Sequence, residues 1–376
     1  MLKRRTIVAL GLVGLVTTGC ATSEAQGPAV APATRAAVQA QLDALTGAGV
    51  VGGLATVRRG GETVEVRSGV GDLAAGNPIP ATTQQVRVGS ITKSFTAVMV
   101  LQLVGEGRVD LDAPIDTYLP GLITEPGFDA GTVTVRQILQ HRSGLAEFSD
   151  DPRGNELAAA RTGVTITPDE ILGVLNGKPA QFPAGTEFRY TNANYIVAGM
   201  LVERVTGRPY AEELQHRILT PLGLADTYLP PAGERAIRGP HPKGYQPEGD
   251  GLTDVSEIEP SVPWAAGAIV STGADIDAFY LALLDGRLLG PVQLDDMVTG
   301  SPDAMGPGFG YGIGLTTFQL ACPGGGTVDA VGHSGGISGY YSFGAATTTG
   351  GAVTYAFTSP PEEVPDMRAL LTPALC

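Results

Sequence analysis

The stretch RVGSITKSF, residues 87–95, places a serine and a lysine three positions apart at the start of an apolar segment. The residues that follow, SFTAVMVLQLVG, leave almost no polar face, which predicts a helix buried on most sides. An unpaired ammonium group loses much favourable free energy away from water, so a buried lysine needs a reason. Lys93 is one of only four lysines in the chain.

Ser90 and Lys93 have the spacing of a nucleophile and its base. Residues i and i+3 lie on one face of a helix, so Lys93 can hydrogen-bond Ser90. A desolvated amine has a lowered pKa and can take the hydroxyl proton. A serine at a helix start also brings its own backbone N–H near the attacked carbonyl. The alternative is a lysine that snorkels to water from the helix start.

Two further motifs support the catalytic interpretation. The tripeptide YTN, residues 190–192, precedes the helical pattern NYIVAGMLVERVTG. Its alternative role is capping, with Asn192 or Asn194 bonding the first amides of that helix. The tripeptide HSG, residues 333–335, lies on a β-rich run, where its glycine admits the close approach of a substrate backbone. A lone histidine near a strand end is more often a bonded surface residue.

Composition excludes several classes of function. The chain has 376 residues, 43% of them hydrophobic, and a formal net charge of -14, so it can bury a substantial core. Its acidity argues against nucleic acid, because phosphate binding needs clustered Lys and Arg. The four histidines show no HExxH spacing and the cysteines form no CxxC, so neither a metal nor a cofactor is expected. His141 is interpreted as structural.

The amino terminus has the pattern of an export signal over residues 1–20. Basic residues 3–5 precede an apolar run at 7–16 that is too short to span a bilayer. Cys20, directly after a glycine, is similar to the acylated cysteine of bacterial lipoproteins; plain cleavage is the alternative. Residues 21–33 then predict a flexible Pro/Ala tether. We expect an exported, lipid-anchored chain outside the cytoplasm.

The β-rich runs lie at the two ends of the remaining chain. Two near the start and three near the end predict a five-stranded antiparallel sheet, followed by a last helix over 364–371. Residues of about 105–255 show helical spacing. The predicted fold class is therefore α/β (α+β), one domain over 34–376 whose sheet is flanked by helices and carries a mainly helical insertion. A cleft between these parts is the default site. The five runs are GGLATVRR, ETVEVRSG, TVDAVGH, YYSFGAA and AVTYAFT.

The order and spacing of these motifs resemble the serine β-lactamase and penicillin-binding superfamily, specifically the branch of class C β-lactamases and soluble D-Ala-D-Ala carboxypeptidases. The similarity runs from about residue 52 to the end and includes VRVGSITKSFTAVMVLQLVGEG, VTVRQILQHRSGL, FPAGTEFRYTNANYIVAGMLVERVTG and VGHSGGISGYYSF. The resemblance implies Ser90 as nucleophile, Lys93 as its activator, Tyr190 and His333 as proton carriers, Asn192 as a ligand of the substrate amide, and the N–H groups of Ser90 and Gly336 as the oxyanion hole.

The sequence departs from those carboxypeptidases at one position. They place an arginine on the strand before the HSG-like motif to hold the substrate's terminal carboxylate, but residues 288–367 contain no Arg or Lys. Thr316, Thr317, Ser334 or protonated His333 would have to hold it, more weakly than a guanidinium. Gly335 would admit the substrate backbone, and Trp264 either lines the cleft or packs in the core.

Three functions follow in order. The first is a monomeric, exported D-Ala-D-Ala carboxypeptidase that acts on cell-wall peptides through a Ser90 acyl-enzyme and is acylated by β-lactams. An esterase or class C-like β-lactamase on the same scaffold is second, because of the missing arginine. A noncatalytic penicillin-binding or sensing lipoprotein is third. Cys322 and Cys376 are expected to form a disulfide, as pairs outside the cell usually do and as the resemblance also implies.

Overall fold

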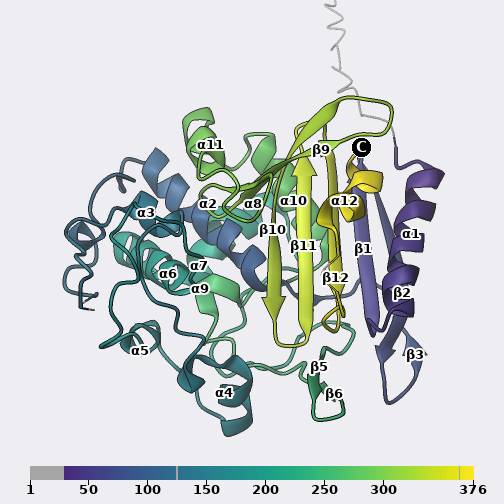
Figure 1. Ribbon diagram of the computed structural model, residues 1–376, viewed down its shortest axis with the longest axis horizontal. Helices are drawn as coiled ribbons and strands as arrows, with labels where there is room; N and C mark the ends of the chain where they lie inside the picture. Colours follow the sequence, from purple (N-terminus) through teal and green to yellow (C-terminus); the bar gives the residue numbers. More distant parts are fainter. Residues whose placement is uncertain (1–28, 124–125, 364) are drawn as a thin grey trace, which may run out of the picture.

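A central antiparallel sheet organises the computed structural model, which describes residues 29–123, 126–363 and 365–376 (Figure 1). The sheet has eight strands in the order β3-β2-β1-β12-β11-β10-β9-β8. Two short ladders, β4 with β7 and β5 with β6, lie outside it. The strands of the main sheet are β1 (Gly52–Arg59), β2 (Glu62–Asp72), β3 (Asn77–Pro78), β8 (Phe309–Tyr311), β9 (Thr316–Ala321), β10 (Thr327–Ile337), β11 (Tyr340–Thr347) and β12 (Gly351–Phe357).

The predicted count of five strands was wrong, although the fold class is confirmed. The five expected runs are β1, β2, β10, β11 and β12, and the sheet is extended at its edges by β3, β8 and β9. β3 has two residues and β8 has three, too few for alternation of apolar and polar residues to show. β9 does alternate more and less buried positions, a signal that the five-strand prediction did not use.

The two ends of the chain meet within this sheet, as the sequence predicted. β1 pairs antiparallel with β12, with Gly53 opposite Phe357, and Figure 1 shows the purple strand beside the yellow one. β10, which carries the HSG motif, lies between β9 and β11, with His333 opposite Gly344. The pairing with β9 ends at Gly332, so the motif at 333–335 is paired with β11 alone and its other edge is left free of β9.

Helices cover both faces of the sheet. α1 and α12 pack on one face, where buried Leu42, Phe343 and Leu371 share a core. α2 and α10 lie on the other, where the rings of Phe95 and Phe279 stack with centroids 3.8 Å apart. These four helices are α1 (Pro32–Gly47), α2 (Thr92–Gly105), α10 (Gly273–Leu284) and α12 (Met367–Leu375).

The stretch predicted as a helical insertion, about 105–255, is mainly helical and contains one small hairpin. Its longest helix, α6, packs against α2, α3, α5 and α7. The elements of this stretch and of the segments beside it are β4 (Val86–Arg87), η1 (Gly89–Ile91), η2 (Ile115–Thr117), α3 (Val135–Leu139), η3 (Pro152–Gly154), α4 (Glu156–Thr162), α5 (Pro168–Gly173), α6 (Ala193–Thr206), α7 (Tyr210–Leu214), η4 (Gln215–Leu219), α8 (Thr220–Leu222), β5 (Tyr245–Glu248), β6 (Gly251–Asp254), α9 (Trp264–Gly267), β7 (Val270–Ser271) and α11 (Pro291–Val298).

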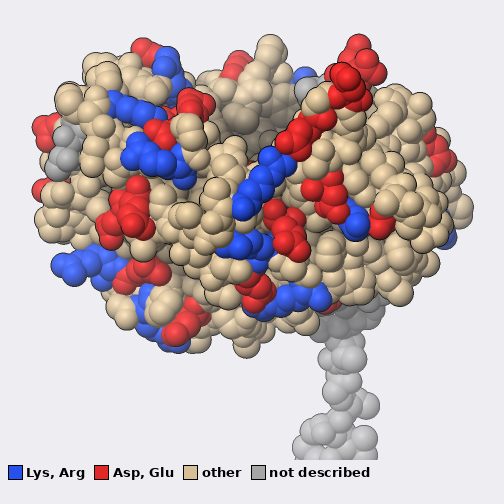
Figure 2. Space-filling model, turned by 90° about the horizontal axis from the view of Figure 1, so that it is seen from below, with Lys and Arg blue, Asp and Glu red and all other residues tan. Residues whose placement is uncertain are grey.

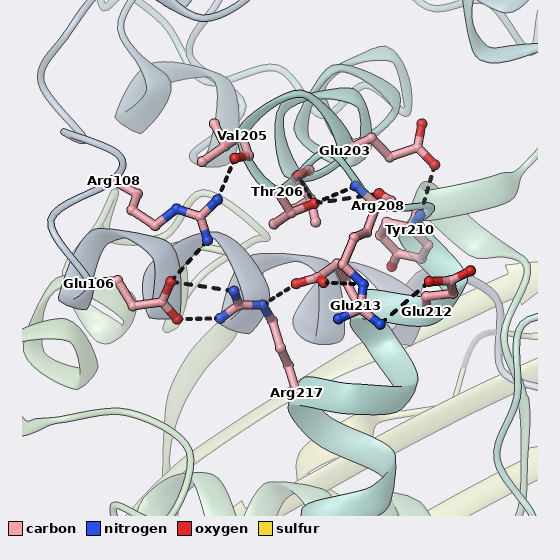
Figure 3. Close-up of polar contacts among 11 residues, drawn as sticks. Glu106, Arg108, Glu203, Val205, Thr206, Arg208, Tyr210, Glu212, Glu213 and Arg217 are labelled. Atoms are coloured by element: carbon pink, nitrogen blue, oxygen red, sulfur yellow. Dashed lines mark hydrogen bonds and ion pairs between the residues drawn. The ribbon is translucent and has the colours of Figure 1, made fainter.

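Ion pairs brace the junction of α7 with the π-helical turn η4 (Figure 3). Arg217 lies between two carboxylates and is 2.5 Å from an oxygen of each, Glu213 on one side and Glu106 on the other. Arg208 approaches Glu213 at 3.4 Å. Because the Glu213 side chain is only 3% exposed, these guanidinium groups compensate a carboxylate that has lost most of its water.

A helix cap and a disulfide hold the carboxyl-terminal segment in place. The side chain of Asp366 accepts from the amides of Arg368 and Ala369, so α12 begins at Met367, later than the predicted start at 364, which lies outside the described residues. Cys376, the last residue, is bonded to Cys322, which confirms the predicted disulfide. The bond joins two positions 54 apart in the sequence, one just after the end of β9 and the other at the terminus.

The predicted export signal, Cys20 and most of the tether lie outside the described residues. α1 begins at Pro32, so the last two positions of the predicted tether are helical. Within residues 29–123, 126–363 and 365–376, no helix has the length and apolar character needed to cross a membrane. Figure 2 shows acidic and basic side chains interspersed over one face of the molecule.

Candidate active site

The candidate nucleophile Ser90 lies in the 3-10 turn η1, which joins β4 to α2. Gly89 has φ +51, and a Cβ added to it would lie 2.8 Å from the backbone nitrogen of Gly336. A Cβ on Gly335 would clash with the carbonyl oxygen of Val88. Glycine is therefore required on both surfaces where β10 packs against the turn. Gly335 makes room for the chain's own backbone, whereas the sequence suggested room for substrate.

Lys93 is enclosed by protein and donates to three oxygens. Its Nζ lies 2.9 Å from Ser90 Oγ, 2.8 Å from Asn192 Oδ1 and 2.7 Å from the carbonyl oxygen of Ala266. The side chain has no solvent exposure, so it does not snorkel to water. The spacing of Ser90 and Lys93 thus produces the contact that the sequence predicted.

The environment of Lys93 lowers the pKa of its ammonium group. Burial brings the pKa to about 7 from 10.5, and the nearby carboxylate of Glu147 acts in the opposite direction. A lysine with this pKa exists in both charged and neutral forms near neutrality. The neutral amine can accept the Ser90 proton, and Asn192 Oδ1 and the Ala266 carbonyl can then hold the resulting ammonium ion.

Tyr190 and Asn192 reach the same place from the segment before α6. Asn192 stands at the N-cap position, but its side chain caps no helix amide and instead accepts from Lys93. The Tyr190 ring centroid is 5.0 Å from Lys93 Nζ. Burial raises the pKa of the Tyr190 phenol, and its interaction with the Ser90 hydroxyl opposes that rise. The Asn192 side chain therefore contacts Lys93 directly and does not cap α6.

His333 is also brought to this centre, but it is buried behind it. The imidazole is 1% exposed, with Nε2 3.1 Å from the Tyr311 hydroxyl and Nδ1 2.5 Å from the Ser334 carbonyl oxygen. Burial, followed by the charge of Lys93, lowers the pKa of His333 to about 3. A protonated His333 that holds a carboxylate, one of the four options that the sequence left open, is therefore disfavoured.

The remaining predicted residues divide into exposed and packed groups. Ser334 and Gly336 are exposed and Ser90 is half-buried, so the reacting side of β10 and η1 is open to solvent. Thr316 is buried and pairs with Gly332 across the β9–β10 ladder. Trp264 is half-buried and packs against the helical core, with its ring 5.3 Å from that of Tyr210 and against Gly199 of α6. This placement favours core packing, the second role considered for the tryptophan.

Three residues that the sequence did not assign to the site contact its members. Glu147 Oε2 accepts from the backbone N–H of Asn192 at 2.7 Å. Tyr311 contacts His333, and it also contacts His141, whose ring lies 4.2 Å from that of Tyr190. His141 has φ +56, a left-handed conformation that is rare outside glycine. The sequence does not reveal this backbone conformation, and the interpretation of His141 as structural did not include its contact with Tyr190.

Comparison with known proteins agrees with this geometry. The family model described as Beta-lactamase matches residues 35–374. Penicillin-binding protein 4 of Amycolatopsis lactamdurans is 29% identical over 85% of this chain and 86% of its own length. Esterase EstB of Burkholderia gladioli is 33% identical over 59% of this chain, and the match spans 57% of that esterase.

Two kinds of solved structure are similar over nearly their whole length. A D-stereospecific amidohydrolase from Streptomyces sp. superposes with a TM-score of 0.80 at 34% identity, covering 89% of this chain and 97% of the other. D-amino acid amidase from Ochrobactrum anthropi SV3 superposes at 0.76 with 30% identity, covering 88% and 93%. The fold is that of serine hydrolases. The chain therefore belongs to the Beta-lactamase family, within the superfamily of serine β-lactamases and penicillin-binding proteins.

Proposed function

We propose that this serine hydrolase forms an acyl-enzyme on Ser90 with small D-configured amides or peptides, and that it is exported. The observation that carries the proposal is the 2.9 Å contact of Ser90 Oγ with a fully buried Lys93 amine whose pKa is about 7. That pairing supplies a nucleophile and a base at neutral pH. The amino-terminal pattern over 1–20 supports export, with Cys20 as the residue that would carry a lipid.

The reaction proceeds in two halves. Neutral Lys93 takes the Ser90 proton as Oγ attacks the substrate carbonyl carbon, and the backbone N–H groups of Ser90 and Gly336 stabilise the oxyanion. The C–N bond then breaks, and the leaving amine takes a proton from the Lys93 ammonium ion through the Tyr190 hydroxyl. Water attacks the acyl carbon in the second half, losing a proton to Lys93, and Ser90 recovers its proton as the acid leaves.

Charge around the site favours amides over peptides that end in a carboxylate. Residues 288–367 contain no Arg or Lys, and His333 is neutral. Glu147 accepts from the backbone N–H of Asn192, and its carboxylate is close enough to raise the pKa of Lys93 and of Tyr190. The terminal carboxylate of a peptide would be repelled by this negative charge and would have no guanidinium partner. An uncharged amide or a substrate with a free amino group would not be repelled. The similarity to a D-stereospecific amidohydrolase and a D-amino acid amidase supports the same substrate class.

The D-Ala-D-Ala carboxypeptidase predicted from sequence is the second candidate. It is favoured by the 29% identity to a penicillin-binding protein over most of both chains, and by the position of the HSG motif beside Ser90. The esterase and β-lactamase alternatives use the same acyl-enzyme and differ only in leaving group. All of these substrates compete for one nucleophile.

Covalent labelling followed by a substrate comparison tests the proposal. A fluorescent penicillin should label the chain on Ser90, located by mass spectrometry, and Ser90→Ala should remove the label. Hydrolysis of D-alanine amide should then exceed release of D-alanine from a D-Ala-D-Ala peptide, and the L-amide should be a poor substrate. Equal amide hydrolysis by Ser90→Ala would refute the mechanism, and faster D-alanine release would select the carboxypeptidase.

A further inference from the structure

Five buried side chains form one continuous chain of hydrogen bonds behind Tyr190. Each is at most 2% exposed, and together they connect the turn after α3, helix α6, strand β8 and strand β10. The proposed mechanism assigns none of them a step. In order they are Ser143, Asn194, His141, Tyr311 and His333.

At the Ser143 end of this hydrogen-bond chain, backbone N–H groups fix which atoms donate and which accept. The backbone N–H of Leu145 donates to Ser143 Oγ at 3.0 Å, so the serine hydroxyl proton is free to point to Asn194 Oδ1 at 2.7 Å. The Asn194 amide nitrogen then donates to His141 Nδ1 at 3.1 Å, and the Thr191 N–H donates to the same atom at 3.2 Å. His141 therefore accepts at Nδ1 and carries its proton on Nε2.

At the His333 end, the donors and acceptors are fixed independently by the Ser334 carbonyl. A carbonyl oxygen can only accept, so the contact with Ser334 requires a proton on His333 Nδ1. In neutral His333, Nε2 then accepts from the Tyr311 hydroxyl at 3.1 Å. The Tyr311 oxygen in turn accepts from His141 Nε2 at 3.2 Å. The two deductions meet at Tyr311 without conflict.

Neighbouring groups do not offer a competing proton. Tyr195, which lies beside Tyr311, donates its own hydroxyl proton to the Leu139 carbonyl at 2.9 Å, so it supplies no proton to Tyr311. Its oxygen is a second acceptor for the Tyr311 hydroxyl besides His333 Nε2. The titratable groups that face His333 are Lys93 of α2, Tyr190, Tyr311 and, beyond Tyr311, His141. Glu147, which accepts from the backbone N–H of Asn192, acts on Lys93. A protonated His333 would add a second cation beside Lys93.

We infer that His141 and Tyr311 are positioning residues that hold the neutral His333 imidazole in a single tautomer. The leaving-group proton then passes through Tyr190 and Lys93 alone, and His333 serves to fix the β10 backbone beside Ser90. His141 also supports the Tyr190 ring, since the two rings lie 4.2 Å apart at 31°. The inference rests on the proposed Ser90 chemistry for its kinetic part only.

Nitrogen NMR of the intact protein, labelled with ¹⁵N-histidine, tests the tautomers without reference to activity. The chain has four histidines, so His216→Gln and His241→Gln complete the assignment. We expect His141 to carry its proton on Nε2 and His333 on Nδ1, both unchanged from pH 5 to 8. A proton on His333 Nε2, or a doubly protonated His333 above pH 5, would overturn the inference even if Ser90 proved unreactive.

Tyr311→Phe tests the kinetic part, since it removes one hydroxyl and no ring. We expect the ¹⁵N resonance of His333 Nε2 to shift in this variant, because that atom loses its hydrogen-bond donor. Penicillin acylation should slow by about 10- to 100-fold with the noncovalent Kd unchanged, the range expected for a buried polar group left unpaired. His141→Asn, which tolerates a left-handed backbone, should act in the same direction.

Tyr355→Phe is the matched control. Its hydroxyl also makes two hydrogen bonds, to Gln41 and to the Leu370 carbonyl, but on the opposite face of the sheet. It should lose stability and keep its acylation rate. If Tyr311→Phe acylates within twofold of the unmodified protein, or slows only as much as Tyr355→Phe, Tyr311 has no positioning role.

Discussion

Lys93 Nζ lies 2.9 Å from Ser90 Oγ and is closed off from solvent on every side. Because only the neutral amine can accept a proton, acylation should follow the pKa of about 7. We expect kcat/KM to fall about tenfold for each pH unit below 7 and to level off above it. Stopped-flow acylation from pH 5 to 9 measures this, and a flat profile would mean that Lys93 is not the base.

The same lysine should make stability depend on pH. Its pKa is about 7 in the folded protein and near 10.5 when unfolded, so between these values the unfolded chain binds more protons and stability rises with pH. Lys93→Met replaces the amine by an apolar side chain of similar length, so it should fold, lose acylation and lose this rise. Urea unfolding at pH 7, 8.5 and 10 compares the two proteins. An equal slope in Lys93→Met would contradict the lowered pKa.

Gly89→Ala should separate backbone strain from damage to the site. Both Gly89 and Gly107 have positive φ, so alanine at either costs about 1–2 kcal/mol. Only at Gly89 would the new Cβ press against the backbone of Gly336, whereas nothing lies within 4 Å at Gly107. Displacing β10 by a fraction of an ångström should lower acylation about 100-fold in Gly89→Ala alone. Similar acylation by both alanine variants would show that the contact with Gly336 is unimportant.

Local geometry explains why the Ser90–Lys93 pair was predictable. The two residues are three positions apart, so one helical turn brings them together whatever the rest of the chain does. Asn192 was ambiguous, because its choice between capping α6 and binding Lys93 depends on a residue 99 positions away. His141 and Tyr311 are 170 positions apart, and Tyr311 lies on a three-residue strand with no periodic signal. Their contact follows only from the assembled sheet and helices.

Arg217→Met should show how strongly the buried carboxylate of Glu213 depends on its partner (Figure 3). The side chains of this i,i+4 pair are 11% and 3% exposed, so removing the cation should lower the free energy of unfolding by about 2–4 kcal/mol. Arg208 still lies beside Glu213 in the variant, so the carboxylate keeps one cationic partner. Arg238→Met breaks an i,i+4 pair with Glu234 whose side chains are 52% and 34% exposed, and should cost at most about 1 kcal/mol.

Urea unfolding of the two arginine variants and of the double variant Arg217→Met/Glu213→Leu measures these costs. The double variant should regain most of the lost stability, because an apolar pair needs no compensation. Equal losses in Arg217→Met and Arg238→Met would mean that burial of the Glu213 pair has no energetic consequence.

Asp277, on α10 beneath the sheet, should make the protein less stable at high pH. Its Oδ1 accepts from Thr354 Oγ1 at 2.6 Å, and its buried Oδ2 has no hydrogen-bond partner among the described residues. Burial raises the pKa of this carboxyl well above its usual value. The folded protein therefore holds a proton that the unfolded chain releases near pH 4, so stability falls as pH rises above 4.

Asp277→Asn keeps the acceptor for Thr354 and removes the ionisable group. Because asparagine does not titrate, the stability of the variant relative to the unmodified protein should increase from pH 5 to pH 9, by about 1.4 kcal/mol for each unit that separates the folded and unfolded pKa of Asp277 within that range. Thr354→Val removes the hydroxyl that donates to the carboxylate, which should raise the pKa of Asp277 further and increase the pH dependence. Urea unfolding at pH 5, 7 and 9 compares the three proteins. Because Asp277 lies away from Ser90, acylation per folded molecule should stay constant, and parallel pH curves for all three would show that Asp277 does not titrate on unfolding.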